Sequence, residues 1–189
     1  MHLNREQAWQ LLQRYVTGVS LLKHCMAVEI AMKAYAGKFG GDPEYWGMVG
    51  LLHDIDFEQY PDDHPHHARE ILLSQGFNDE FIVNVESHAR DWPETRTAIQ
   101  KTLLAVDELT GFVIACALVR PDKSLDHLEV KSVLKKFKDK AFARAVNRET
   151  IKNSTAAMDV ELRDHIGFVI AALAQAAHDP AYQQLPLVG

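Results

Sequence analysis

The chain has 189 residues, of which 47% are hydrophobic and 24% are charged, and its formal net charge is −6. This length suits one domain that buries about two-thirds of the surface its unfolded chain exposes, and the acidic total disfavours nucleic acid as a partner. No stretch approaches the roughly 18 uninterrupted apolar residues of a membrane span and no secretory signal is recognisable, so we expect a cytoplasmic protein with no membrane partner.

Helical periodicity dominates the sequence, and the alternation typical of strands is scarce. Asn4 and Gln7 have the spacing of a capping box, and Asp42 followed by Pro43 supplies an N-cap and a first-turn proline. The second helix is expected to stop at Gly37, which is followed by Gly40 and Gly41. The helices that such signals predict cover about 4–15, 20–36, 42–52, 64–75, 78–89, 95–119, 127–137, 139–145, 148–155 and 159–178.

Two of the later helices begin at residues that cap well, Asn78 and Asp159, and a break near Gly111 is one option for the longest helix. The segment 55–63, IDFEQYPDD, has the proline and the acidic residues of a loop. No repeat or Gly/Ser-rich linker divides the chain, so we predict a single all-α domain. Its predicted bounds are 1–189 for the domain, about 20–120 for the core region and 121–180 for the C-terminal helices.

The two cysteines, Cys25 and Cys116, lie far apart in the sequence and form no CxxC motif. A disulfide framework is therefore not expected. Each thiol is predicted to be a small buried side chain, which suits a reducing compartment.

Charge is spread unevenly along the chain. Residues 120–152 contain ten basic and five acidic residues, a net charge of +5 that leaves −11 for the rest. Such a block is usually a solvated helix surface. The sharper hypothesis is a surface that helps to bind phosphate, and a nucleic-acid interface is the weaker one because the remaining chain is acidic.

The sequence contains ten histidines, several of them at positions that helical spacing turns inward. His24 shares a predicted face with Leu21 and Val28, and His88 shares one with Val85. Imidazole nitrogens and carboxylate oxygens are the donors that divalent transition metals use in proteins. A single histidine on an apolar face is more often a hydrogen-bonded core residue, so neither position identifies a ligand alone.

Two aspartates strengthen the metal hypothesis. His53 and Asp54 end an apolar helix, where both could reach one ion. On the dipeptide alone, we favour the simpler interpretation of a capping histidine beside a loop aspartate. Asp107 falls on an apolar helix face. Burying an unpaired carboxylate costs several kcal/mol, so Asp107 needs a cation, a metal ion or strong donors.

Between these residues lies the histidine-rich segment DDHPHHAREIL. His64 and His67 are three residues apart and can share a helix face, whereas His66 points elsewhere, and spacing alone favours neither of the first two as a ligand. Asp56 and Glu58 are either partners of ligand histidines or solvated loop acids, and we favour the second interpretation.

Taken in order, these residues resemble the H…HD…H…H…D pattern of the HD superfamily of metal-dependent phosphohydrolases. The resemblance covers about 20–120 and is carried by MVGLLHDID, by HPHHAREIL, which is similar to the HPxxGxxIL of binuclear members, and by AVDELTG. Ala68 stands where that second motif usually has glycine. The whole chain looks like the small stand-alone HDIG-type proteins of bacteria and archaea, known as predicted hydrolases, whose C-terminal part resembles VIACALVRPDKSLDHLEVKSVLKKFKDK.

The resemblance implies a helical bundle of HD type that holds one or two divalent ions of Fe, Mn, Ni, Co or Zn. The implied metal ligands are His24, His53, Asp54 and Asp107 for one ion, and His64 and His88 with a bridging Asp54 for a second, with His67 as the alternative to His64. His53 and Asp54 would also be the catalytic residues. The candidates for binding phosphate are Arg90, Lys101, Arg120, Lys123 and Lys131.

The implied activity is hydrolysis of a phosphomonoester or phosphodiester, in a nucleotide or another small phosphorylated metabolite. The alternative is a metal-binding module without turnover that senses a nucleotide or binds a partner. The sequence leaves the substrate, the metal and the oligomeric state open.

Overall fold

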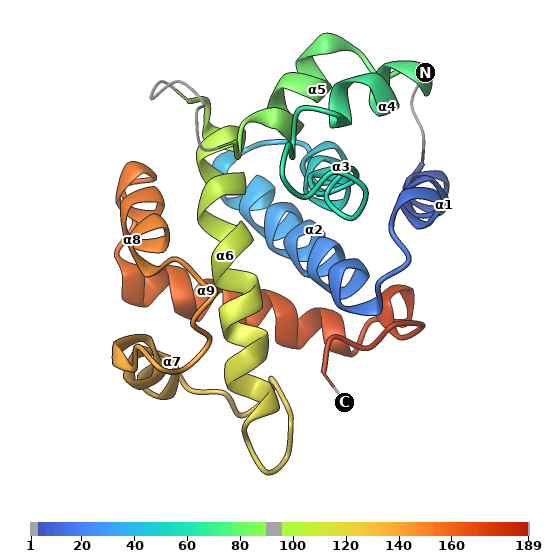
Figure 1. The fold of residues 1–189 in the computed structure, drawn as a ribbon. Coiled ribbons are helices and arrows are strands. Elements are labelled where there is room, and N and C mark those ends of the chain that lie inside the picture. The colour runs from blue at the N-terminus through green and yellow to red at the C-terminus, as the bar shows by residue number, and fades with distance from the viewer. Residues whose placement is uncertain (1–3, 90–95, 189) are drawn as a thin grey trace. The chain divides into compact units, whose positions relative to one another are not determined.

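The computed structural model describes residues 4–89 and 96–188. Every regular element in these two segments is a helix, which confirms the predicted all-α class (Figure 1). The chain separates into two compact units, Met1–Leu103 and Leu104–Gly189, and the boundary falls within helix α6 (Ala98–Leu118). That the whole chain acts as one domain stays a prediction.

The first unit contains five complete helices and the beginning of α6. They are α1 (Arg5–Tyr15), α2 (Val19–Phe39), α3 (Pro43–Leu52), α4 (Ala68–Ser74) and α5 (Asp79–Glu86). The predicted capping box opens α1, since Asn4 Oδ1 accepts the Gln7 N–H at 2.9 Å and Gln7 Oε1 accepts the Asn4 N–H at 3.0 Å. Asp42 and Asn78 cap α3 and α5 through their side chains, also as predicted.

The most extensive packing in this unit is between α2 and α3, which follow one another in the chain as a helical hairpin. Gly50 permits their close approach: a Cβ atom on Gly50 would lie only 3.0 Å from the backbone carbonyl group of Val28. His24 lies one turn before Val28 on α2, and His53 lies just under one turn after Gly50 at the end of α3. The contact at Gly50 therefore sets how closely these two imidazoles can approach.

The second unit contains the remainder of α6 and three further helices. They are α7 (Val130–Lys138), α8 (Arg148–Ala157) and α9 (Leu162–Ala177), followed by the short 3₁₀ helix η1 (Pro180–Tyr182). Helix α9 packs against both α7 and α8. The thiols of Cys116 on α6 and Cys25 on α2 are buried, as predicted. No helix in the described part of the chain is long and apolar enough to cross a membrane.

Several predicted helix boundaries in the first unit are wrong. Helix α2 continues through Gly37 to Phe39 and ends at Gly40, whose left-handed φ of 73° is the conformation that stops a helix. The predicted helix over 64–75 begins only at Ala68, because the backbone N–H groups at its start are bound by a side chain from an earlier loop.

In the second unit, the predicted helix over 139–145 is a series of turns. The guanidinium group of Arg148 accounts for this, since it donates to the carbonyl oxygens of Ala143 and Val146 at 2.9 Å and to that of Phe142. Asp159 is not an N-cap, because it adopts a left-handed φ of 55° and Glu161 precedes α9 instead. Helix α6 is continuous through Gly111.

Replacing Gly50 with Ala should destabilise the protein by about 1–3 kcal/mol, because the added methyl group meets the backbone of α2 and the two helices must move apart. Gly111→Ala is the matched control. A Cβ atom at Gly111 has nothing within 4 Å, so this change should be neutral or stabilising by up to about 1 kcal/mol. Urea denaturation of both variants measures the difference, and equal effects at the two positions would contradict the steric explanation.

Candidate metal centre

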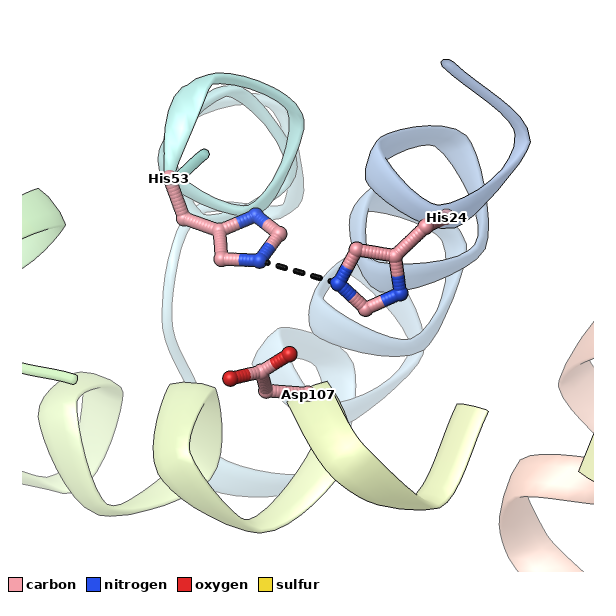
Figure 2. Close-up of side chains that lie close together, drawn as sticks. All are labelled: His24, His53 and Asp107. Carbon is pink, nitrogen blue, oxygen red and sulfur yellow. Dashed lines mark hydrogen bonds between the residues drawn. The ribbon is translucent and has the colours of Figure 1, made fainter. Parts of the chain in front are cut away.

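The first part of the candidate centre is a pair of histidines from α2 and the end of α3. The Nε2 atoms of His24 and His53 lie 3.2 Å apart, with the two rings edge to face (Figure 2). His53 Nδ1 donates to the carbonyl oxygen of Gly50 at 2.8 Å, so in the neutral ring Nε2 carries the lone pair. The His53 side chain is fully buried, and that of His24 is 23% exposed. Of the two side chains, only that of His24 therefore has surface in contact with solvent.

Asp54 is the carboxylate at the centre of the cluster. Its Oδ1 lies 3.1 Å from His64 Nε2, 3.3 Å from His53 Nε2 and 3.5 Å from His88 Nε2. Its Oδ2 lies 3.5 Å from His24 Nε2. The structure thus brings four of the predicted histidine ligands around one buried carboxylate, from α2, α3, the 64–67 turn and the end of α5.

His64 and His88 form a second pair, with Nε2 atoms 2.8 Å apart. His88 Nδ1 donates to the carbonyl oxygen of Val85 at 2.7 Å, and His64 Nδ1 lies 2.6 Å from Asp56 Oδ1, which can only accept when ionised. In the neutral rings both Nε2 atoms then carry lone pairs, which repel each other unless a proton or a metal ion lies between them.

The donor chemistry of this second pair fits a divalent metal ion. Asp54, His64 and His88 each offer one ligand atom, and these atoms lie within 4.8 Å of one another. Histidine ligands in proteins commonly donate their second ring N–H to a carbonyl or a carboxylate, which fixes the ring and its tautomer. His53, His64 and His88 all show this arrangement.

The charges of the cluster reinforce one another. Burial alone would raise the pKa of Asp54, but His53, His64, His88 and His24 together hold that pKa well below its ordinary value of 3.8. Burial also opposes a charge on His64, yet its hydrogen bonds to Asp54 and Asp56 raise the pKa of this imidazole to about 9. A proton on His64 therefore competes with any metal ion in the neutral pH range.

His67 lies differently from His64. Its Nε2 is 2.9 Å from Asp63 Oδ2, its ring stacks on Tyr60 at a centroid distance of 3.9 Å, and its side chain is 35% exposed. It belongs to none of the groups around Asp54 that could hold a metal ion among the residues described. Helical spacing could not separate the two histidines because the 64–67 segment is not helical.

Asp56 corrects the expectation of a solvated loop acid. Its side chain is fully buried and accepts from His64 Nδ1 and from the backbone N–H groups of His67 and Ala68. Glu58 is exposed, but it binds the N–H groups of Thr17 and Gly18 immediately before α2. The sequence signal for Asp56 was its position two residues after Asp54, which by itself does not reveal these distant partners.

Cys25 is a second residue that sequence reasoning did not place at the site. Its thiol, the His53 ring and the Asp54 carboxylate form another group whose ligand atoms lie within 4.8 Å of one another. Cys25 directly follows His24 on α2 and is fully buried, as expected for a small apolar side chain. Its burial was predicted, and its nearness to the histidines was not.

None of the remaining predicted residues that the structure describes belongs to the groups that contain Asp54. Asp107, labelled in Figure 2, is a candidate metal ligand on α6, four residues beyond Leu103, and is half-buried. Lys101 is half-buried on the same helix, and Arg90 lies outside the described residues. Arg120 pairs with Asp122, and Lys131 pairs with Glu129. Lys123 is exposed in a turn.

A family model for the HD domain matches residues 21–167. The chain belongs to the HD domain family. Neither a curated protein sequence nor a solved structure matches the chain significantly. HD domains bind divalent metal ions and are generally hydrolases of the metal-dependent phosphohydrolase type, although some members lack catalysis. The histidines around Asp54 belong to groups of this HD domain that could hold such an ion.

The metal-free HD domain should lose stability as the pH rises from about 6.5 to about 9. The pKa of His64 is higher in the folded protein than its ordinary value of 6.5. Protonation of His64 therefore stabilises the folded state fully below pH 6.5, and this contribution to the free energy of unfolding is lost as the pH rises to about 9. This amounts to about 3 kcal/mol at most. Urea denaturation in EDTA across this range measures the loss.

A His64→Gln variant should remove this pH dependence, whereas His67→Gln should retain it. An unchanged profile in His64→Gln would show that another group titrates. At acid pH the protein should instead lose stability as the pH falls. The pKa of Asp54 is lowered in the folded protein, so ionised Asp54 stabilises the fold fully above pH 3.8, and this contribution is lost as the pH falls further.

Proposed function

We propose that this HD domain is a metal-dependent phosphohydrolase that cleaves a phosphomonoester or phosphodiester, in a nucleotide or another small phosphorylated metabolite. The observation that carries the proposal is the convergence of four imidazole Nε2 atoms on the buried carboxylate of Asp54. Membership of the HD family supports it.

The site would hold one or two divalent ions of Fe, Mn, Ni, Co or Zn. The proposed ligands are His24, His53, Asp54 and Asp107 for one ion, and His64, His88 and the shared Asp54 for the other. When bound, such ions act as Lewis acids toward a phosphoryl oxygen and make a water molecule a nucleophile near neutral pH.

The protein's own residues hold the donors in place and limit the access of water. The carbonyl oxygens of Gly50 and Val85 orient His53 and His88 so that Nε2 faces Asp54. Asp54 stays ionised at neutral pH because the surrounding histidines favour its charged form. His24, the most exposed of the four rings, marks the side from which a phosphate ester would approach.

His64 is the proposed ligand in preference to His67, because its Nε2 contacts Asp54 whereas His67 pairs with Asp63. Lys101, Arg90, Arg120, Lys123 and Lys131 remain proposed phosphate-binding residues. Arg120 and Lys131 are already engaged with carboxylates of their own segment, so a role in phosphate binding would require them to exchange those partners.

Protein purified without chelator should contain a divalent metal and should hydrolyse at least one member of a panel of phosphate esters when supplied with Mn, Fe, Ni, Co or Mg. His53→Ala and Asp54→Ala should each lower that activity by more than about 100-fold, since each removes a metal ligand. The matched control is His178→Ala, which removes an exposed histidine paired with Asp126 and should leave activity unchanged.

Two results would contradict the proposal: no bound metal, or hydrolysis that survives in both site variants. Metal-dependent nucleotide binding with no turnover under any of these ions would instead support a nucleotide-sensing HD module without catalysis. The ions must saturate the site in this experiment, because a half-loaded centre would also show binding without turnover.

A further inference from the structure

Asp56 is a fully buried carboxylate outside the proposed ligand set. It lies two residues after Asp54 in the turn that follows α3, and its side chain has no exposed surface. Oδ1 lies 2.6 Å from His64 Nδ1, and Oδ2 accepts the backbone N–H groups of His67 and Ala68, each at 3.1 Å. One side chain therefore joins the end of the His53–Asp54 segment to the segment that carries His64.

The direction of these hydrogen bonds carries chemical information. Because an ionised carboxylate can only accept, the ring nitrogen Nδ1 of His64 must carry the proton in this contact. Nε2 of the neutral ring is then unprotonated, and it is the atom that lies 3.1 Å from Asp54 and 2.8 Å from His88 Nε2. Phe57 packs edge-on against the same ring at a centroid distance of 5.2 Å and limits its rotation.

We propose that Asp56 is the positioning residue that makes His64 a metal ligand. Its carboxylate selects the tautomer with Nε2 free, and it anchors the turn so that this atom faces Asp54. The inference rests on the metal site of the proposed function and adds a residue to it. It predicts that binding at the Asp54, His64 and His88 group depends on Asp56, while binding at the His24 and His53 pair does not.

The Asp56→Asn variant separates tautomer selection from packing. The asparagine carbonyl oxygen is expected to keep accepting the backbone N–H groups of His67 and Ala68, because this orientation of the amide retains two hydrogen bonds and the reverse orientation would retain only the one to the His64 ring. Its NH₂ group then faces His64 Nδ1, which must accept. The proton moves to Nε2, and this atom can no longer bind a metal ion.

Compared with Asp56→Asn, the Asp56→Ala variant should lower the stability of the fold more and metal binding less. It leaves the backbone N–H groups of His67 and Ala68 without their acceptor, so it should destabilise the fold more than Asp56→Asn. It leaves the His64 ring free to adopt either tautomer, so metal binding should be weakened but not blocked. The two variants should therefore rank in opposite orders for stability and for binding of the second ion.

The test is a titration of the full-length, metal-free chain with Co²⁺, followed by calorimetry and by the visible absorption bands of the bound ion. Wild-type protein should take up two Co²⁺ per chain. Asp56→Ala should weaken the second site by about 10-fold, and Asp56→Asn by about 100-fold or more. Thermal unfolding of the metal-free variants gives the stability order.

Asp63→Asn is the matched control, because it makes the same charge change in the same loop at an exposed carboxylate that pairs with His67. It should bind two Co²⁺ like the wild type. If Asp56→Ala does not fold, the comparison of Asp56→Asn with Asp63→Asn decides the question alone.

Three results would overturn the inference: a second Co²⁺ bound by Asp56→Asn as tightly as by the wild type, tighter binding in Asp56→Asn than in Asp56→Ala, or no second Co²⁺ in the wild type. Loss of the second ion in Asp63→Asn only would overturn it too and would identify His67 as the ligand. A wild type that binds two Co²⁺ but hydrolyses no ester with any of the five metals of the activity panel would contradict only the phosphohydrolase proposal. The order of the two Asp56 variants in Co²⁺ binding then tests the inference separately.

Discussion

The burial of the Asp54 carboxylate is the constraint on which the rest of the first unit depends. An ionised carboxylate away from water costs several kcal/mol unless cations or strong donors surround it. Here its neighbours are imidazoles whose Nδ1 atoms, in His53 and His88, are already committed to backbone carbonyls. Those rings cannot turn a second N–H toward Asp54 while they are neutral. The balance of charge therefore has to come from protons or from metal ions.

The fold meets this constraint through elements that each supply one fixed ring. The close approach of α2 and α3 at Gly50 brings His53 to His24, and the end of α5 holds His88 through the carbonyl of Val85. His64 comes from a turn and not from a helix, so it depends on a side chain to hold it. That dependence explains why a fully buried aspartate is found at position 56, in a segment whose composition is that of a loop.

Local signals in the sequence predicted three helix N-caps correctly, but they failed at Gly37 and at Asp159. The caps at Asn4, Asp42 and Asn78 were predicted because each bonds to an amide two or three residues away. The turns over 139–145 were not predicted, since they depend on the guanidinium of Arg148 from the following helix. The metal hypothesis needed the order of several histidines along the chain, and the role of Asp56 needed contacts that span 8 to 12 residues.

Stability does not explain a cluster of this kind. Replacing a buried ionic group by apolar side chains of similar volume is often neutral or stabilising, so a buried Asp–His cluster is weak evidence for a structural role. The Nε2 atoms of His64 and His88 face each other at 2.8 Å, an arrangement that is unfavourable for two neutral rings. The same arrangement becomes favourable when a proton or a metal ion lies between the two Nε2 lone pairs. The geometry therefore suits a cation, and the hydrogen bonds to Asp54 and Asp56 that raise the pKa of His64 to about 9 favour positive charge at the same place.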